Sequence, residues 1–176
     1  HLSPTVSVES YAALGFNYRL TDIQAAIGRE QLARLPEVVA RRRALAGRYA
    51  ALLARTPGLG LPIEPRWARS NFQSYCVRLP DGCDQRIVMQ RMLDEGVATR
   101  TGVMCAHREP AYAREPWSCT PGAAACACGA EGCRRLAVSE LAQDRCILLP
   151  LFHEMTDDDQ RRVAEALGVA CGDARN

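Results

Sequence analysis

The 176-residue chain contains no lysine, because all 22 residues counted as lysine or arginine are arginine. The arginine guanidinium stays protonated in proteins, so it cannot serve as an amine nucleophile. Any reaction that needs a lysine amine, such as formation of a Schiff base, is therefore excluded for this chain alone.

Several other features are missing. No apolar run approaches the ~20 residues that a membrane-spanning helix needs. The sequence has no glycine-rich phosphate loop, no GxSxG motif and no HExxH motif. Its net charge of +2 is spread along the chain and indicates neither a nucleic-acid nor a membrane partner. A hydrophobic content of 48% is enough for the core of one ordinary domain.

The clearest local signal is a helix start at Thr21. The Thr21 hydroxyl can accept from the backbone N–H of Gln24, and the Gln24 side chain can reach back to Thr21, as in a capping box. Asp22 adds negative charge at the positive end of the helix. This cap fixes the turn before it, where Asn17 and Arg19 can face outward toward an anion or a carboxylate. Alternatively, Arg19 only pairs with Asp22, and Asn17 only fits a turn.

Two helices are predicted after this cap. The first runs from about Asp22 to Arg34, and Pro36 is expected to begin a second helix in a new direction. The second helix has one apolar stripe, which consists of Val38, Leu45, Tyr49 and Leu52.

The run Arg41-Arg42-Arg43 is typical of a solvated helix face, and no binding role is predicted for it. Arg42 lies within the apolar stripe. Its stem is expected to lie along apolar surface, with its head reaching water or an acidic partner.

The remaining chain predicts a small sheet covered by helices on one face. A loop of about 56–69 precedes a half-buried strand over 73–79, with Tyr75, Val77 and Leu79 on one side. The further expected elements are a helix capped by Asp84 and ended by Gly96, a strand over 97–103, a helix over about 134–143, a strand over 146–149, and a last helix from Thr156 to Gly168.

Five segments, in order, carry a resemblance to a known family. They are GFNYRLTDIQAAIGREQLARL from Gly15, SNFQSY from Ser70, GVATR from Gly96, HREPAY from His107, and LLPLF from Leu148 ahead of Met155-Thr156. Together they resemble the C-terminal part of the DegT/DnrJ/StrS group of nucleotide-sugar aminotransferases, which are fold-type-I pyridoxal-phosphate (PLP) enzymes.

The resemblance implies an α/β fold, namely the C-terminal small domain of a fold-type-I PLP-dependent transferase preceded by a long helical arm. Residues 1–55 would form the lead-in and the interface arm, and residues 56–72 a linker. Residues 73–176 would form the small domain, with a cysteine-rich insertion at 117–133.

The resemblance also implies a function. The chain would be part of a PLP-dependent aminotransferase that moves an amino group from glutamate or glutamine to a keto-sugar nucleotide. In the family the cofactor lysine lies upstream of the GFNYR-type turn, and this chain begins at His1. We therefore expect that an N-terminal part is missing and that this chain alone is inactive. Some relatives replace the lysine and act as dehydratases, and this alternative stays open.

Site residues follow from the same resemblance. Asn17 would reach across a homodimer, formed through the helical arm, to the cofactor phosphate of the neighbouring subunit. Arg19 would either orient the turn or contact substrate. His107 and Tyr112 would lie on a loop that lines the sugar-nucleotide entrance.

The nine cysteines are the last candidates. Their odd number, a start that is unlike a signal peptide, and the family resemblance together predict a reducing cytoplasm. Four of them crowd one stretch and are compatible with zinc, with disulfides or with inert thiols: Cys119, Cys126, Cys128 and Cys133. Two further readings stay open. One is a non-catalytic zinc-binding or protein-interaction module, and the other is a truncated pseudo-enzyme fragment that would aggregate or dimerise.

Overall fold

The computed structural model describes residues 18–110 and 135–173. These residues divide into two compact units, the first ending at Pro36 and the second beginning at Glu37. The helix α1 (Asp22–Leu53) runs from the first unit into the second, and each unit is described by itself below.

The first unit contains the predicted capping box. The backbone N–H of Gln24 donates to Thr21 Oγ1 at 3.3 Å, and the backbone N–H of Thr21 donates to Gln24 Oε1 at 3.0 Å. Asp22 lies in the first turn, where its charge complements the helix dipole. The predicted start of the helix is confirmed.

The prediction that Pro36 begins a separate helix is wrong. α1 is one helix of 32 residues with Pro36 inside it. A proline removes a single N–H from the ladder of hydrogen bonds, so the bonds on either side can still form. Beyond Pro36, α1 buries Leu45, Ala46, Tyr49 and Leu53, and this packing favours a continuous helix.

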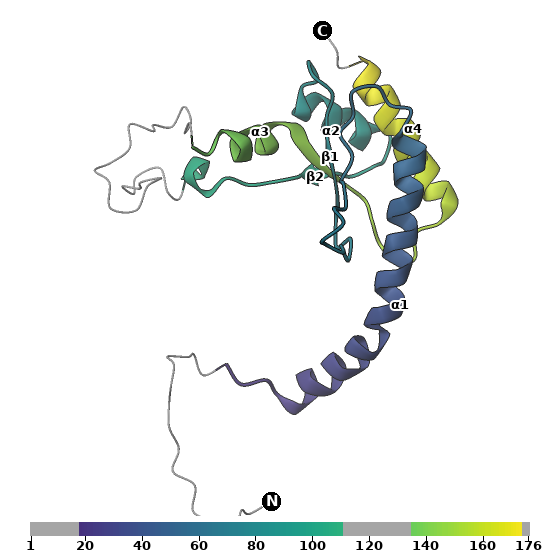
Figure 1. The fold of residues 1–176 in the computed structure, drawn as a ribbon, viewed down its shortest axis with the longest axis vertical. Coiled ribbons are helices and arrows are strands. Elements are labelled where there is room, and N and C mark those ends of the chain that lie inside the picture. The colour runs from purple at the N-terminus through teal and green to yellow at the C-terminus, as the bar shows by residue number, and fades with distance from the viewer. Residues whose placement is uncertain (1–17, 111–134, 174–176) are drawn as a thin grey trace, which may run out of the picture. The chain divides into compact units, whose positions relative to one another are not determined.

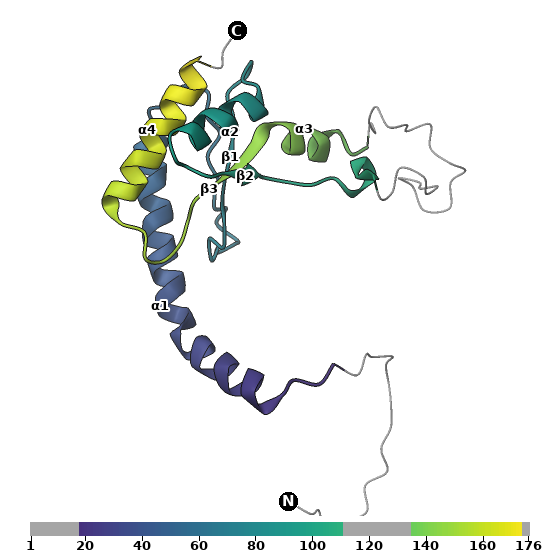
Figure 2. The same ribbon diagram turned by 180° about the vertical axis from the view of Figure 1, so that it is seen from behind.

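The second unit is built on a three-stranded antiparallel sheet. Its strands are β1 (Tyr75–Arg78), β2 (Arg100–Thr101) and β3 (Cys146–Leu149) in the order β1-β3-β2. Cys146 pairs with Arg78 in β1, and Leu148 pairs with Arg100 in β2. Figures 1 and 2 show the sheet from opposite sides. β3 matches its prediction, whereas only two residues of the strand expected over 97–103 are strand.

The described helices of this unit, besides α1, are α2 (Gln85–Asp94), the 3-10 turn η1 (Ala106–Arg108), α3 (Ala137–Arg145) and α4 (Asp157–Asp173). The predicted fold, a small sheet covered by helices, is confirmed. None of the helices in the described parts of the chain has the length and apolar character that crossing a bilayer requires.

The predicted caps at the starts of α2 and α4 are confirmed, but the predicted end of α4 is wrong. Asp84 Oδ1 accepts from the N–H of Ile87 at 3.0 Å, and Thr156 Oγ1 accepts from the N–H of Asp159 at 3.1 Å. The last helix does not end at Gly168 but continues to Asp173. A helical glycine costs about 1 kcal/mol relative to alanine, and burial of Ala170 and Cys171 offsets that cost.

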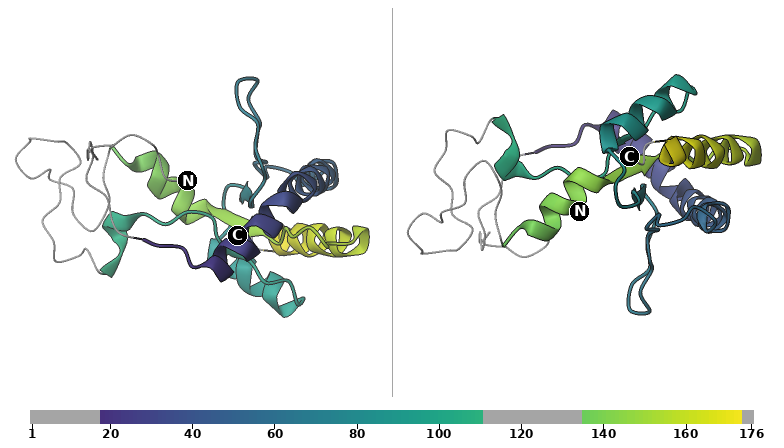
Figure 3. Two further views of the ribbon diagram at one scale, coloured as in Figure 1. Left: turned by 90° about the horizontal axis from the view of Figure 1, so that it is seen from below. Right: turned by 90° about the horizontal axis from the view of Figure 1, so that it is seen from above.

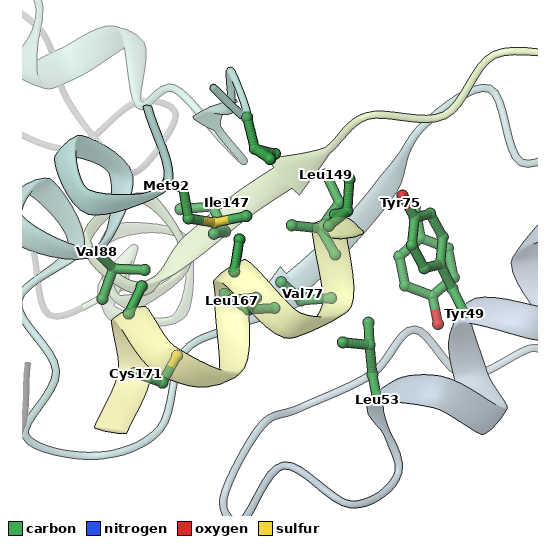
Figure 4. Packing of buried hydrophobic residues seen from close by; sticks show 14 of the residues in the cluster. Tyr49, Leu53, Tyr75, Val77, Val88, Met92, Ile147, Leu149, Leu167 and Cys171 are labelled. Atoms are coloured by element: carbon green, nitrogen blue, oxygen red, sulfur yellow. The ribbon is translucent and has the colours of Figure 1, made fainter. Parts of the chain in front are cut away.

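The core lies between the sheet and helices α1, α2 and α4 (Figure 4). The predicted alternation in β1 is confirmed, because Tyr75, Val77 and Leu79 are each at most 1% exposed. The other large, fully buried side chains of this core come from the helices and from β3, namely Leu45, Tyr49, Leu53, Val88, Met92, Ile147 and Leu167.

The arginine run is not a plain solvated face. Arg41 Nη2 donates to the carbonyl of Met155 at 2.8 Å. Arg42 Nη1 donates to the carbonyl of Gln73 at 2.7 Å. Arg43 donates to Glu64 through Nη1 and Nη2, each at 3.0 Å. The three side chains therefore tie the second half of α1 to the loops around the sheet.

Candidate functional site

The most buried charged cluster of the described residues is built around His107. This histidine lies in η1, two residues after the buried Cys105, and its side chain is 10% exposed. His107 Nε2 lies 2.7 Å from Glu140 Oε1 on α3, and Glu140 is itself buried. A buried carboxylate at hydrogen-bonding distance fixes the orientation of the imidazole ring.

Arg108 adds a second contact between η1 and α3. Its Nη1 donates to Asp144 Oδ1 at 2.6 Å, and its Nη2 lies 3.7 Å from Glu140 Oε2. The hydrogen bond to Asp144 is the main reason that the pKa of Arg108 is raised, and the charge of Glu140 adds to it. Glu140 and Asp144 are four residues apart on α3, so they lie on one helix face. From there they contact His107 and Arg108 of η1.

Asp144 also borders a cavity of about 650 Å³. Its walls come from α2, from β2 with the residues before it, and from the end of α3, and they mix apolar and polar groups. The lining includes Met89, Leu93, Thr99, Thr101 and Gln143. The cavity has the size of a small-molecule pocket.

The turn before α1 is described only in part. Arg19 is exposed, and in the described part of the first unit it forms no ion pair with Asp22. Asn17 lies outside the described residues, so its predicted phosphate contact stays a prediction. His107 and Arg19 belong to different units, and each is described in its own unit only.

The remaining candidates also lie outside the described residues: Tyr112, Cys119, Cys126, Cys128 and Cys133. Within residues 18–110 and 135–173, no group of three metal-binding side chains occurs. The five cysteines of these ranges are free thiols. Burial raises the pKa of Cys76 to about 11, and the neighbouring Cys146 contributes, so Cys76 is mostly protonated at neutral pH.

Sequence reasoning missed Glu140 and Asp144. The available signal was a pair of acids at i and i+4 on a predicted helix and a His-Arg pair on a separate segment. Because 33 residues separate His107 from Glu140, no local pattern links them.

The chain is similar in structure to sugar aminotransferases of known structure. TlmJ, an aminotransferase from Streptoalloteichus hindustanus, matches with a TM-score of 0.72 and 29% identity over 93% of this chain. DesI, determined with its TDP-sugar product, matches with a TM-score of 0.67 and 28% identity over 84%. The PLP form of Spr1654 from Streptococcus pneumoniae matches with a TM-score of 0.71 over 89% of this chain, and at 18% identity it supports the fold alone.

The family follows from the sequence. Residues 5–168 match the DegT/DnrJ/EryC1/StrS aminotransferase family, and the chain belongs to it. The chain spans only about 40% of the length of TlmJ, 35% of DesI and 37% of Spr1654. The predicted resemblance to this family is confirmed.

Proposed function

We propose that this chain acts as the C-terminal part of a PLP-dependent aminotransferase that transfers an amino group from glutamate or glutamine to a keto-sugar nucleotide. The observation that carries the proposal is the family match over residues 5–168, together with a fold that covers about 40% of the length of TlmJ. DesI, which resembles this chain, was determined with a TDP-sugar product.

The residues present do not fit covalent attachment of PLP. The cofactor is held in such enzymes by a lysine amine, and this sequence contains no lysine. No catalytic step is therefore assigned to this chain. In the proposed enzyme the lysine comes from outside this sequence, and the chain contributes binding and assembly.

The arm is the proposed contact between subunits. Before Pro36 its apolar side chains are exposed: Leu20 by 68%, Ile23 by 74% and Ile27 by 60%. An exposed group of apolar side chains is typical of a protein interface. A second copy of the chain would cover this face, and Asn17 would then reach the cofactor phosphate of the partner.

The His107 loop is the proposed substrate contact. The buried Glu140 and the exposed Asp144 bind His107 and Arg108, and these contacts hold η1 against α3. We place His107 and Tyr112 at the entrance for the sugar nucleotide. Arg19 is a further proposed substrate contact, made by its own unit.

The test uses this chain alone and a chimera in which it replaces the C-terminal part of TlmJ. The isolated chain, treated with PLP and borohydride, should show no pyridoxyl adduct on a side chain by peptide mass mapping. The chimera should form a dimer and produce amino sugar from glutamate. N17A in the chimera should weaken PLP binding by about tenfold, since a hydrogen bond to a charged group is lost.

Two results would overturn this function. One is transamination by the isolated chain, which has no lysine. The other is a soluble, dimeric chimera that neither transfers an amino group nor responds to N17A. A dehydrated sugar in place of an amino sugar would identify the dehydratase alternative.

A further inference from the structure

Residues Ile63–Ser70, here called the Trp67 loop, form a tip that is fixed at both ends. Arg43 holds Glu64 through two hydrogen bonds, and its Nη1 also donates to the carbonyl of Ser70. Within the loop, the N–H of Ala68 donates to the carbonyl of Pro65 at 3.0 Å and closes a turn. One guanidinium therefore binds both ends of the loop and preorganises its tip. Figure 3 shows that the backbone between α1 and β1, which includes this loop, projects away from the helices.

The tip exposes its large apolar side chains to solvent. Trp67 is 88% exposed and Ile63 is 89% exposed, although other aromatic side chains of this unit, such as Tyr49 and Tyr75, are buried. Exposed apolar surface is unfavourable by about 25 cal/mol per Å². A tryptophan held in water on a clamped loop therefore indicates a ligand that covers it.

The charges beside Trp67 indicate which class of ligand the loop can bind. Arg66 and Arg69 flank Trp67 in the sequence, and both are exposed. The one carboxylate of the loop, Glu64, is already paired with Arg43, and in the described part of the chain neither flanking arginine forms an ion pair. The loop thus exposes one aromatic side chain and two cations within four consecutive residues.

We propose that the Trp67 loop binds the nucleoside diphosphate portion of the sugar nucleotide. The base stacks on the indole of Trp67, and the diphosphate oxygens accept from Arg66 and Arg69. Stacking on an aromatic side chain suits any base, and a guanidinium matches the geometry of a phosphate. The inference rests on the proposed function, and it assigns the nucleotide to a loop that neither His107 nor the turn before α1 includes.

The binding test uses W117F, which leaves Trp67 as the only tryptophan. Its fluorescence is titrated with dTDP, UDP and GDP, and with thymidine and pyrophosphate as the two halves of a nucleotide. We expect saturable quenching by at least one nucleoside diphosphate. Thymidine and pyrophosphate should each bind about tenfold more weakly, because each satisfies only one part of the site.

Variants in the W117F background locate the site. R66A and R69A should each weaken nucleotide binding by about three- to tenfold, whereas R55A, which removes an exposed arginine elsewhere, should leave it unchanged. By calorimetry on the natural chain, W67A should abolish binding, and W67F, which keeps an aromatic surface, should retain part of it. Circular dichroism confirms that each variant is folded.

Three results would overturn the inference. They are quenching that stays linear in nucleotide concentration, equal affinity of R66A, R69A and R55A, and Trp67 fluorescence that depends on protein concentration but not on nucleotide. The last result would assign the loop to a second copy of the chain. An active chimera that binds sugar nucleotide equally well with and without W67A would refute this inference alone and leave the proposed aminotransferase function intact.

Discussion

Glu140 of α3 lies 2.7 Å from His107 Nε2 of η1, and this pair joins two segments that are 33 residues apart. Both side chains are about nine-tenths buried, and Arg108 approaches the same carboxylate. The pair therefore holds η1 against α3, and the proposed substrate contact of His107 depends on it.

Replacing Glu140 tests this contact. E140A should lower the free energy of unfolding by about 1–3 kcal/mol, because it removes the carboxylate that lies 2.7 Å from the buried imidazole and the negative charge near Arg108. E140Q keeps one acceptor oxygen and should lose less. Urea denaturation followed by circular dichroism measures both. The exposed acid Glu165 provides the control, since E165A should change stability by no more than about 0.5 kcal/mol. An E140A variant as stable as E165A would contradict the prediction.

The two buried tyrosines of the core offer a matched comparison, since their rings lie 5.1 Å apart. The Tyr49 hydroxyl donates to the carbonyl of Pro150 at 2.9 Å, whereas the buried Tyr75 hydroxyl has no partner among the described residues. Burial raises the pKa of Tyr75 to about 12, so its proton stays in place. Y49F should destabilise the protein by about 1–2 kcal/mol, and Y75F should be neutral or stabilising. Thermal unfolding measures the stability of both variants. An equal loss of stability in Y49F and Y75F would contradict the different roles assigned to the two hydroxyls.

Gly102 provides a steric test of the sheet. A Cβ at this position would lie 2.7 Å from Cys146 Cβ and 2.8 Å from Cys76 Sγ. G102A should therefore cost about 1–3 kcal/mol by overpacking. Gly47 of α1 has nothing within 4 Å of a Cβ, so G47A should instead stabilise the helix by about 0.5–1 kcal/mol. Chemical denaturation of the two variants should give changes of opposite sign, and a neutral G102A would show that β2 can move away from β3.

Acid should weaken the start of α4. Asp159 Oδ2 accepts from the hydroxyl and the N–H of Thr156, and these hydrogen bonds lower the pKa of Asp159. Because its pKa is lower in the folded state, the stabilisation is fully present above the unfolded pKa of about 3.9 and is lost as pH falls through the folded value. Urea midpoints measured between neutral pH and about pH 3 should fall more steeply for the natural chain than for D159N. Parallel pH profiles would contradict this role.

Several features could be predicted because they depend only on residues that are close in the sequence. The capping box of Thr21 and Gln24 and the cap at Asp84 join residues three positions apart, so their hydrogen bonds could be predicted without tertiary information. The strand at 146–149 was recognisable as an apolar run closed by Pro150. The family resemblance was also readable from short motifs, and the match over residues 5–168 confirms it.

Helix continuity could not be predicted in the same way. Pro36 and Gly168 both disfavour helix locally, yet α1 and α4 run through them. Inside a helix, relative to alanine, glycine costs about 1 kcal/mol and proline about 3 kcal/mol. Burial of the residues that follow outweighs them, and this burial exists only once the sheet and helices have packed.

The sequence by itself determined the family, the absence of a lysine, and the capped starts of α1, α2 and α4, because each depends on neighbouring residues or on composition. The tertiary structure alone decided that Glu140 faces His107 and that Arg43 clamps the Trp67 loop at both ends. Charged side chains carry no periodic signal of their distant partners. Their pairing follows from packing of the apolar core, which brings remote segments to hydrogen-bonding distance.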